Sequence, residues 1–155
     1  MSRFGLPRRL LLGAALAPVA AQAAGTVGGG PAPEVSAFAE HRLALQISER
    51  ELHRQDLVLS VANNVLKAYG PDKVAIEVVA FGPGIDLLRA ESPRRSAVDS
   101  LVSQGVRFDL CLNTVETIAR ETGQRPALNP HAIPVEAGVV QLMTLAEAGY
   151  ILVRP

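Results

Sequence analysis

The order of apolar and amphipathic segments is the sequence feature that most limits the fold. After residue 40, short runs rich in β-branched residues alternate with longer stretches in which apolar residues recur at helical spacing. A glycine follows most of the amphipathic stretches, as is typical of helix ends. Strands are expected at Leu43–Ile47, Val74–Phe81, Val106–Leu112 and Tyr150–Val153, and helices at Leu57–Tyr69, Ile85–Arg89, Ser96–Val102, Thr114–Thr122 and Ala137–Ala148.

This alternation is the βαβ pattern, in which helices connect parallel strands and cover both faces of the sheet. We therefore predict an α/β fold, a three-layer, open, mainly parallel sheet with right-handed, flavodoxin-like connections. Residues 124–135 are predicted to form a proline-rich loop. In the last helix the apolar side chains are expected to point inward, namely Val139, Val140, Leu142, Met143 and Ala146.

The first 23 residues have the composition of a cleavable signal peptide. Three arginines lie near its start, an apolar segment covers residues 10–21, and Ala21-Gln22-Ala23 is a small-x-small cleavage site. The apolar segment is shorter than the roughly 20 residues of a membrane-spanning helix. We predict export by the Sec or the twin-arginine route, cleavage after Ala23, a periplasmic or secreted location and no stable membrane anchor.

Glycine and proline dominate the next segment, so residues 24–40 are predicted to be a linker and residues 41–155 the folded domain. Removal of the signal peptide takes away three arginines and no acidic residue, which leaves a mildly acidic chain. Such a charge argues against a nucleic-acid partner. The chain has one cysteine, so it forms no internal disulfide.

Ligands of open parallel sheets bind beyond the carboxyl ends of the strands. Three predicted segments fall there: Ser48-Glu49, Gly82–Gly84 and Cys111–Thr114. The glycine segment lacks the lysine of a phosphate loop and the three glycines of a dinucleotide site, so Gly82 and Gly84 are expected to shape a tight turn beside a pocket. Asparagine is a poor helix former, which makes Asn64 a further candidate that needs a polar partner near this edge.

Cys111 is the strongest candidate for chemistry. It lies where a predicted strand gives way to a helix, and unpaired backbone N–H groups at a helix start stabilise a thiolate, the nucleophilic form of cysteine. Asn113 or Thr114 could instead serve only as the helix cap, and a lone cysteine is often just a small buried apolar residue. The three histidines share no metal-ligand spacing, so neither a metal nor another cofactor is expected.

Four segments, taken together, make the chain similar to the DsrE/DsrF-like family. They occur in the order and spacing of that family, and the resemblance covers roughly residues 41–155. The segments are Val78–Gly84, Gly105–Thr114, Val135–Val139 and Gly149–Pro155.

The resemblance implies a DsrE-like fold that assembles as a trimer or hexamer, and a sulfur-relay cysteine at Cys111 that accepts sulfane sulfur as a persulfide. We therefore expect a periplasmic sulfur-binding or sulfur-transfer protein in which Cys111 is the reactive residue, Asn113 orients the outer sulfur, and a sulfur donor or acceptor protein is the partner. The alternative is a non-catalytic, oligomeric module that binds a small ligand and in which Cys111 is structural.

Overall fold

The structure is a computed structural model that describes Met1 and residues 38–155. The predicted signal peptide beyond Met1, its cleavage site and most of the predicted linker lie outside the described residues. No helix among the described residues combines the length and the apolar character needed to cross a membrane.

Five parallel strands form a single sheet in the order β4-β3-β2-β1-β5. The central strands are rich in valine, isoleucine and leucine, which suits strands that are covered on both faces. Their bounds are β1 His41–Ile47, β2 Val74–Ala80, β3 Arg107–Cys111, β4 Ile133–Val135 and β5 Ile151–Val153.

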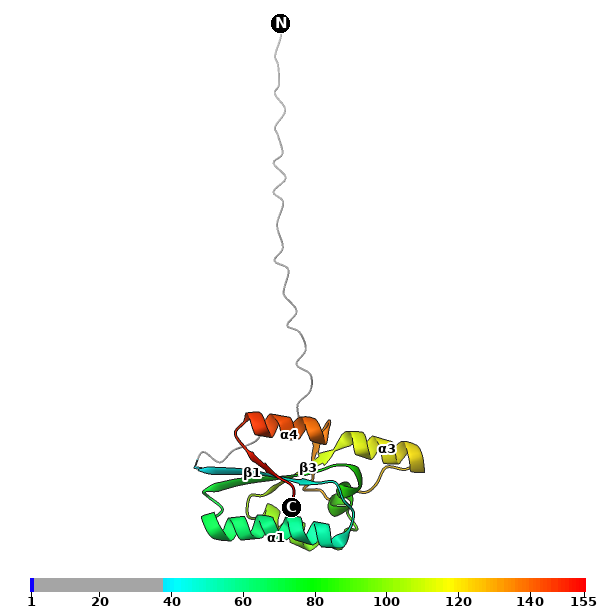
Figure 1. Ribbon diagram of the computed structural model, residues 1–155. Coiled ribbons are helices and arrows are strands. Elements are labelled where there is room, and N and C mark those ends of the chain that lie inside the picture. Colours follow the sequence, from blue (N-terminus) through cyan, green and yellow to red (C-terminus); the bar gives the residue numbers. More distant parts are fainter. Residues whose placement is uncertain (2–37) are drawn as a thin grey trace.

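Helices cover both faces of this sheet, with α1 and α4 on opposite sides (Figure 1). The predicted three-layer α/β class is therefore confirmed. Glycines end two of the helices in the left-handed region of φ, Gly70 at +85° and Gly123 at +75°. The helical segments are α1 Leu52–Tyr69, the 3-10 helix η1 Gly82–Leu88, α2 Arg95–Val102, α3 Leu112–Thr122 and α4 Gly138–Glu147.

The strand order differs from the flavodoxin order 2-1-3-4-5. Here the chain moves steadily from β1 to β4 in one direction, and α4 then carries it across the sheet to place β5 on the other side of β1. The expectation of an uninterrupted loop over residues 124–135 is wrong, because β4 lies within it. Pro134 is compatible with β4 because that strand is at the edge of the sheet and pairs only with β3.

Two hydrophobic clusters fill the spaces between the layers. The larger one lies on the α1 side, where alternate residues of β3 such as Phe108 and Leu110 meet apolar residues of α1, η1 and α2. Val115 at the start of α3 belongs to the same cluster. The smaller one lies on the α4 side and consists of only five buried residues, which are Ala44, Val79, Leu142, Leu145 and Tyr150.

The inward face of α4 is not the predicted one. Leu142 is buried as expected, but the other four residues predicted to point inward are exposed, Met143 to 59%. The buried residues of the helix are Gly138, Gln141, Leu142 and Leu145. α4 is apolar on most of its circumference, so hydrophobic spacing alone could not select its face, and the buried Gln141 marks the side that meets the sheet.

An exposed apolar surface results from this orientation. β5 is an edge strand that pairs only with β1, and α4 lies close to it. We call the exposed apolar residues of these two elements that face the α4 side of the sheet the α4–β5 surface. They are Val139, Val140, Met143 and Leu152, since Leu152 is in register with Ala44 of the cluster on that side.

Candidate functional site

The carboxyl ends of β1, β2 and β3 meet at one edge of the sheet, as parallel strands require. The backbone N–H of Gly82, just after β2, donates a hydrogen bond of 2.9 Å to the Thr114 hydroxyl in the first turn of α3. The structure thus brings these two candidate residues together. This bond ties the start of η1 to the helix that begins after Cys111.

Gly84 contributes close packing rather than a ligand contact. A Cβ atom at this position would lie 2.4 Å from the Ile47 carbonyl oxygen and 2.9 Å from the Ser48 Cα. Only glycine therefore lets η1 lie against the end of β1. The tight turn expected at residues 82–84 takes the form of this 3-10 helix.

Cys111 is the last residue of β3 and immediately precedes α3. Phe108 and Leu110 belong to the cluster on the α1 side, so strand alternation directs Cys111 toward the α4 side. The residue is free and only 5% exposed. The backbone N–H of Asn113 donates to the Glu136 carbonyl at 3.2 Å, which links the start of α3 to the segment before α4, and Asn113 itself is exposed.

Ser48 and Glu49 lie at the same edge, but they bind each other and the C-terminal segment. The Glu49 carboxylate accepts hydrogen bonds from the Ser48 backbone N–H at 3.0 Å and from its hydroxyl at 3.2 Å. It also pairs with Arg154. The hydrogen bond from Arg154 is the main reason that the pKa of Glu49 falls to about 2. This arrangement fixes the chain after β5 to the chain after β1.

Asn64 is separate from these residues. It is exposed on α1, in the half of the helix that leads to Gly70 and the amino end of β2. The structure therefore does not bring Asn64 to the carboxyl edge beside Cys111.

A buried polar cluster under α4 was missed by the sequence analysis. Glu77 on β2 and Asp109 on β3 are both 0% exposed. Gln141 of α4 donates to Asp109 Oδ2 at 3.0 Å, and the Tyr150 hydroxyl donates to Glu77 Oε1 at 3.2 Å. The Nε atom of Arg107 lies 3.6 Å from Glu77 Oε1. We call these five residues the carboxyl cluster.

The two carboxyl groups of this cluster do not ionise independently. Burial, followed by the charge of Glu77 and a hydrogen bond with it, raises the pKa of Asp109 to about 8. Burial also raises the pKa of the Tyr150 hydroxyl above its ordinary range, and Glu77 adds to that effect. At neutral pH Asp109 is therefore protonated.

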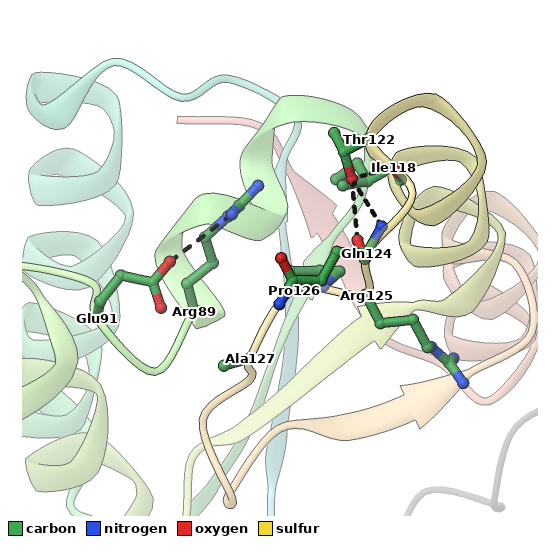
Figure 2. Close-up of a pocket in the computed structure, with 8 residues that line it drawn as sticks. All are labelled: Arg89, Glu91, Ile118, Thr122, Gln124, Arg125, Pro126 and Ala127. Atoms are coloured by element: carbon green, nitrogen blue, oxygen red, sulfur yellow. Dashed lines mark hydrogen bonds and ion pairs between the residues drawn. The ribbon is translucent and has the colours of Figure 1, made fainter.

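Two surface cavities lie near this edge of the sheet, and they share Arg89 and Glu91. Figure 2 shows the first, of about 350 Å³, where Arg89 and Glu91 face the end of α3 and the segment after it. The second, of about 420 Å³, is lined by Arg50, Gln55 and Asp86 among others. Asp86 pairs with both arginines of this cavity, Arg89 at 2.7 Å and Arg50 at 3.8 Å, and Glu91 pairs with Arg89 at 3.7 Å, so two carboxylates balance the two arginines.

Comparison with solved structures identifies a structural relative of this chain. The search for matching family models found none, and no protein with a curated description matches. The solved structure of MTH1491 from Methanobacterium thermoautotrophicum, titled a protein of unknown function, superimposes with a TM-score of 0.66 at 31% sequence identity. The match covers 74% of this chain and 99% of the archaeal chain.

Proposed function

The chain belongs to the same family as MTH1491, and from the position of its cysteine we propose that it is an exported sulfur carrier that holds sulfane sulfur as a persulfide on Cys111. The observation that carries the proposal is the place of the only cysteine, at the carboxyl end of β3 and directly before the first turn of α3. The resemblance to DsrE/DsrF-like proteins supports the same role, and the signal-like N-terminus supports a periplasmic site of action.

The chemistry follows from the position of the thiol. The Asn113 backbone N–H is already bound to the Glu136 carbonyl, so the other backbone N–H groups in the first turn of α3 are the ones that would stabilise negative charge on sulfur, both in the thiolate and in the persulfide anion. Cys111 is only 5% exposed, and sulfur transfer depends on access to the thiol, so a donor or acceptor would have to reach it at the carboxyl edge of the sheet. A sulfur donor or acceptor protein is the partner that this chemistry needs.

Incubation of the mature protein with polysulfide should add the mass of one sulfur atom, measured on the intact protein. The added sulfur should be removed by dithiothreitol, because a thiol reduces the persulfide. The Cys111→Ser variant, which has the same size but no thiol, should gain nothing.

An equal mass gain in the Cys111→Ser variant, or no gain in the wild type, would contradict the carrier function. In that case the second candidate is favoured, a non-catalytic module that binds a small ligand. The specific observation for this alternative is the pair of cavities around Arg89, which lie apart from Cys111. A structural Cys111 would then react with thiol reagents only after unfolding.

We also propose that the protein is a homo-oligomer, a trimer or hexamer, whose subunits meet through the α4–β5 surface. A contiguous exposed apolar area is unusual on a monomeric protein, and an unpaired edge strand favours association. Four apolar residues from α4 and β5 contribute to this surface. A second copy of the chain is the occupant that matches an apolar surface of this kind.

Met143→Lys should lower the mass of the protein in solution, measured by sedimentation velocity, because it places a charge at the most exposed apolar position of α4. Leu52→Lys is the matched control, since Leu52 is an exposed apolar residue at the start of α1, on the opposite side of the sheet. A wild-type protein that sediments as a monomer, or equal masses for the wild type and the Met143→Lys variant, would refute this assembly.

A further inference from the structure

A third cavity, of about 310 Å³, opens at the amino ends of β1, β2 and β5, at the opposite edge of the sheet from Cys111. The first residues of these strands and the end of α1 line it. It shares no lining residue with the two cavities around Arg89. Its volume lies at the lower end of the range of small-molecule sites, so it can hold only a small ligand.

Aliphatic side chains line much of this cavity. Leu43, Val65 and Val74 belong to the hydrophobic cluster on the α1 side or pack against it. Ile151 is in register with Leu43 and therefore points to the same side of the sheet. It remains 69% exposed, since α1 packs mainly over β1 and β2. An apolar ligand group placed here would remove this exposed surface from water, which is favourable.

Two rings lie beside these aliphatic side chains. His41 at the start of β1 and Tyr69 at the end of α1 are in contact, with ring centroids 4.1 Å apart and planes tilted by 42°. Both residues line the cavity and are exposed, Tyr69 to 48%. A further ring can pack against such a pair edge to face or with an offset. The cavity therefore favours a planar, apolar ligand group.

Arg42 gives the cavity a positive charge that no described residue balances. It makes neither an ion pair nor a hydrogen bond within residues 38–155, whereas every other arginine of that range makes at least one. Its guanidinium extends to Gly149, where an added Cβ would lie 3.6 Å from Nη1. Glu40 also lines the cavity, but it pairs with Lys73 at 3.6 Å. In contrast to Arg50 and Arg89 in the cavity at the carboxyl edge, Arg42 is thus free to bind an anion.

We propose that this cavity binds a small aromatic carboxylate, with its ring beside Tyr69 and Ile151 and its carboxylate on Arg42. A guanidinium and a carboxylate form paired, charge-assisted hydrogen bonds, which fix the orientation of the ligand. The aliphatic and aromatic lining then contacts the ring. The site is independent of Cys111, so it goes beyond the carrier function and does not require it.

Phenylacetate is the probe, and the amide resonances of Tyr69 and Gly149 in two-dimensional NMR spectra of the mature protein report its binding. We expect shifts that saturate with a dissociation constant on the order of 1 mM, which suits so small a ligand. Acetate, which has the carboxylate without the ring, should bind at least about tenfold more weakly. 2-Phenylethylamine, which has the ring with the opposite charge, should cause no saturable shift.

Arg42→Gln should weaken phenylacetate binding by about tenfold, because it removes the charge that pairs with the carboxylate. Tyr69→Leu, which keeps an apolar side chain but removes the ring, should weaken it by about threefold. Arg120→Gln is the matched control and should bind like the wild type, since Arg120 lies on α3 outside the lining and donates only to the Thr117 hydroxyl.

Three results would overturn the proposal. They are the absence of a saturable shift with phenylacetate, equal affinities of acetate and phenylacetate, and equal affinities of the wild type and Arg42→Gln. Shifts of Tyr69 and Gly149 that follow the protein concentration but not phenylacetate would place a second copy of the chain in the cavity, and they too would overturn it. If Arg42→Gln does not fold, Tyr69→Leu decides in its place. The polysulfide reaction decides separately whether Cys111 carries sulfur.

Discussion

The wild-type protein should become less stable as the pH rises from about 4 to about 8, and the Asp109→Asn variant should lose this trend. The pKa of Asp109 is raised from its ordinary value of 3.8 to about 8 in the folded protein. Between these values the native state holds a proton that the unfolded state has released. The free energy of unfolding therefore falls with pH, by up to about 1.4 kcal/mol per pH unit.

Urea unfolding at a series of pH values measures this slope. Asparagine keeps an acceptor oxygen for Gln141 and needs no proton, so Asp109→Asn should be more stable than the wild type at pH 8 and close to it at pH 4. Asp99→Asn should retain the wild-type slope, because Asp99 lies on α2, away from the carboxyl cluster. Parallel curves for the wild type and Asp109→Asn would show that Asp109 is ionised throughout this range.

The Gly84→Ala variant should be strongly destabilised, by about 3 kcal/mol. The new Cβ would lie 2.4 Å from the carbonyl oxygen and 2.7 Å from the carbonyl carbon of Ile47. These are backbone atoms of the fully buried end of β1, so they cannot move without disturbing the sheet. The midpoint of urea unfolding at one fixed pH measures the loss.

Gly138→Ala is the matched control for this substitution. Its Cβ would meet the side chain of Phe81 at 2.9 Å, so a single side chain obstructs it instead of the backbone of a central strand. α4 can shift outward because only a small cluster holds it against the sheet. We expect a loss of about 1 kcal/mol. A loss in Gly84→Ala no larger than that in Gly138→Ala would mean that η1 can move away from β1.

The fold class could be predicted because strands and helices of this chain have distinct hydrophobic periods. β2 is an almost unbroken run of apolar residues, and α1 has apolar residues at helical spacing. β4 could not be predicted in the same way. It has three residues, one of them Pro134, and pairing with β3 rather than its own composition makes it a strand.

The candidate site was only partly predictable. The carboxyl ends of the strands follow from topology, which is why Gly82 and Thr114 were chosen and are found in contact. Asn64 was chosen for its low helix propensity, a weak signal that is as compatible with an exposed surface as with a site. The carboxyl cluster could have been inferred from the sequence more readily than a role for Asn64. Glu77 and Asp109 are the only acidic residues within the apolar strands β2 and β3.

The return of the chain from β4 to β5 has a consequence for biosynthesis. β1 is the first strand to be made, and one side of it pairs with β2 soon afterwards, but its other side must wait for residues 151–153. Pairing over such a sequence separation is slow, and an open strand edge attracts other chains in the meantime. A nascent chain of this protein therefore passes through a stage in which one edge of β1 is unpaired. The yield of native protein then depends on how soon β5 is made and on whether a chaperone binds the open edge of β1 in the meantime.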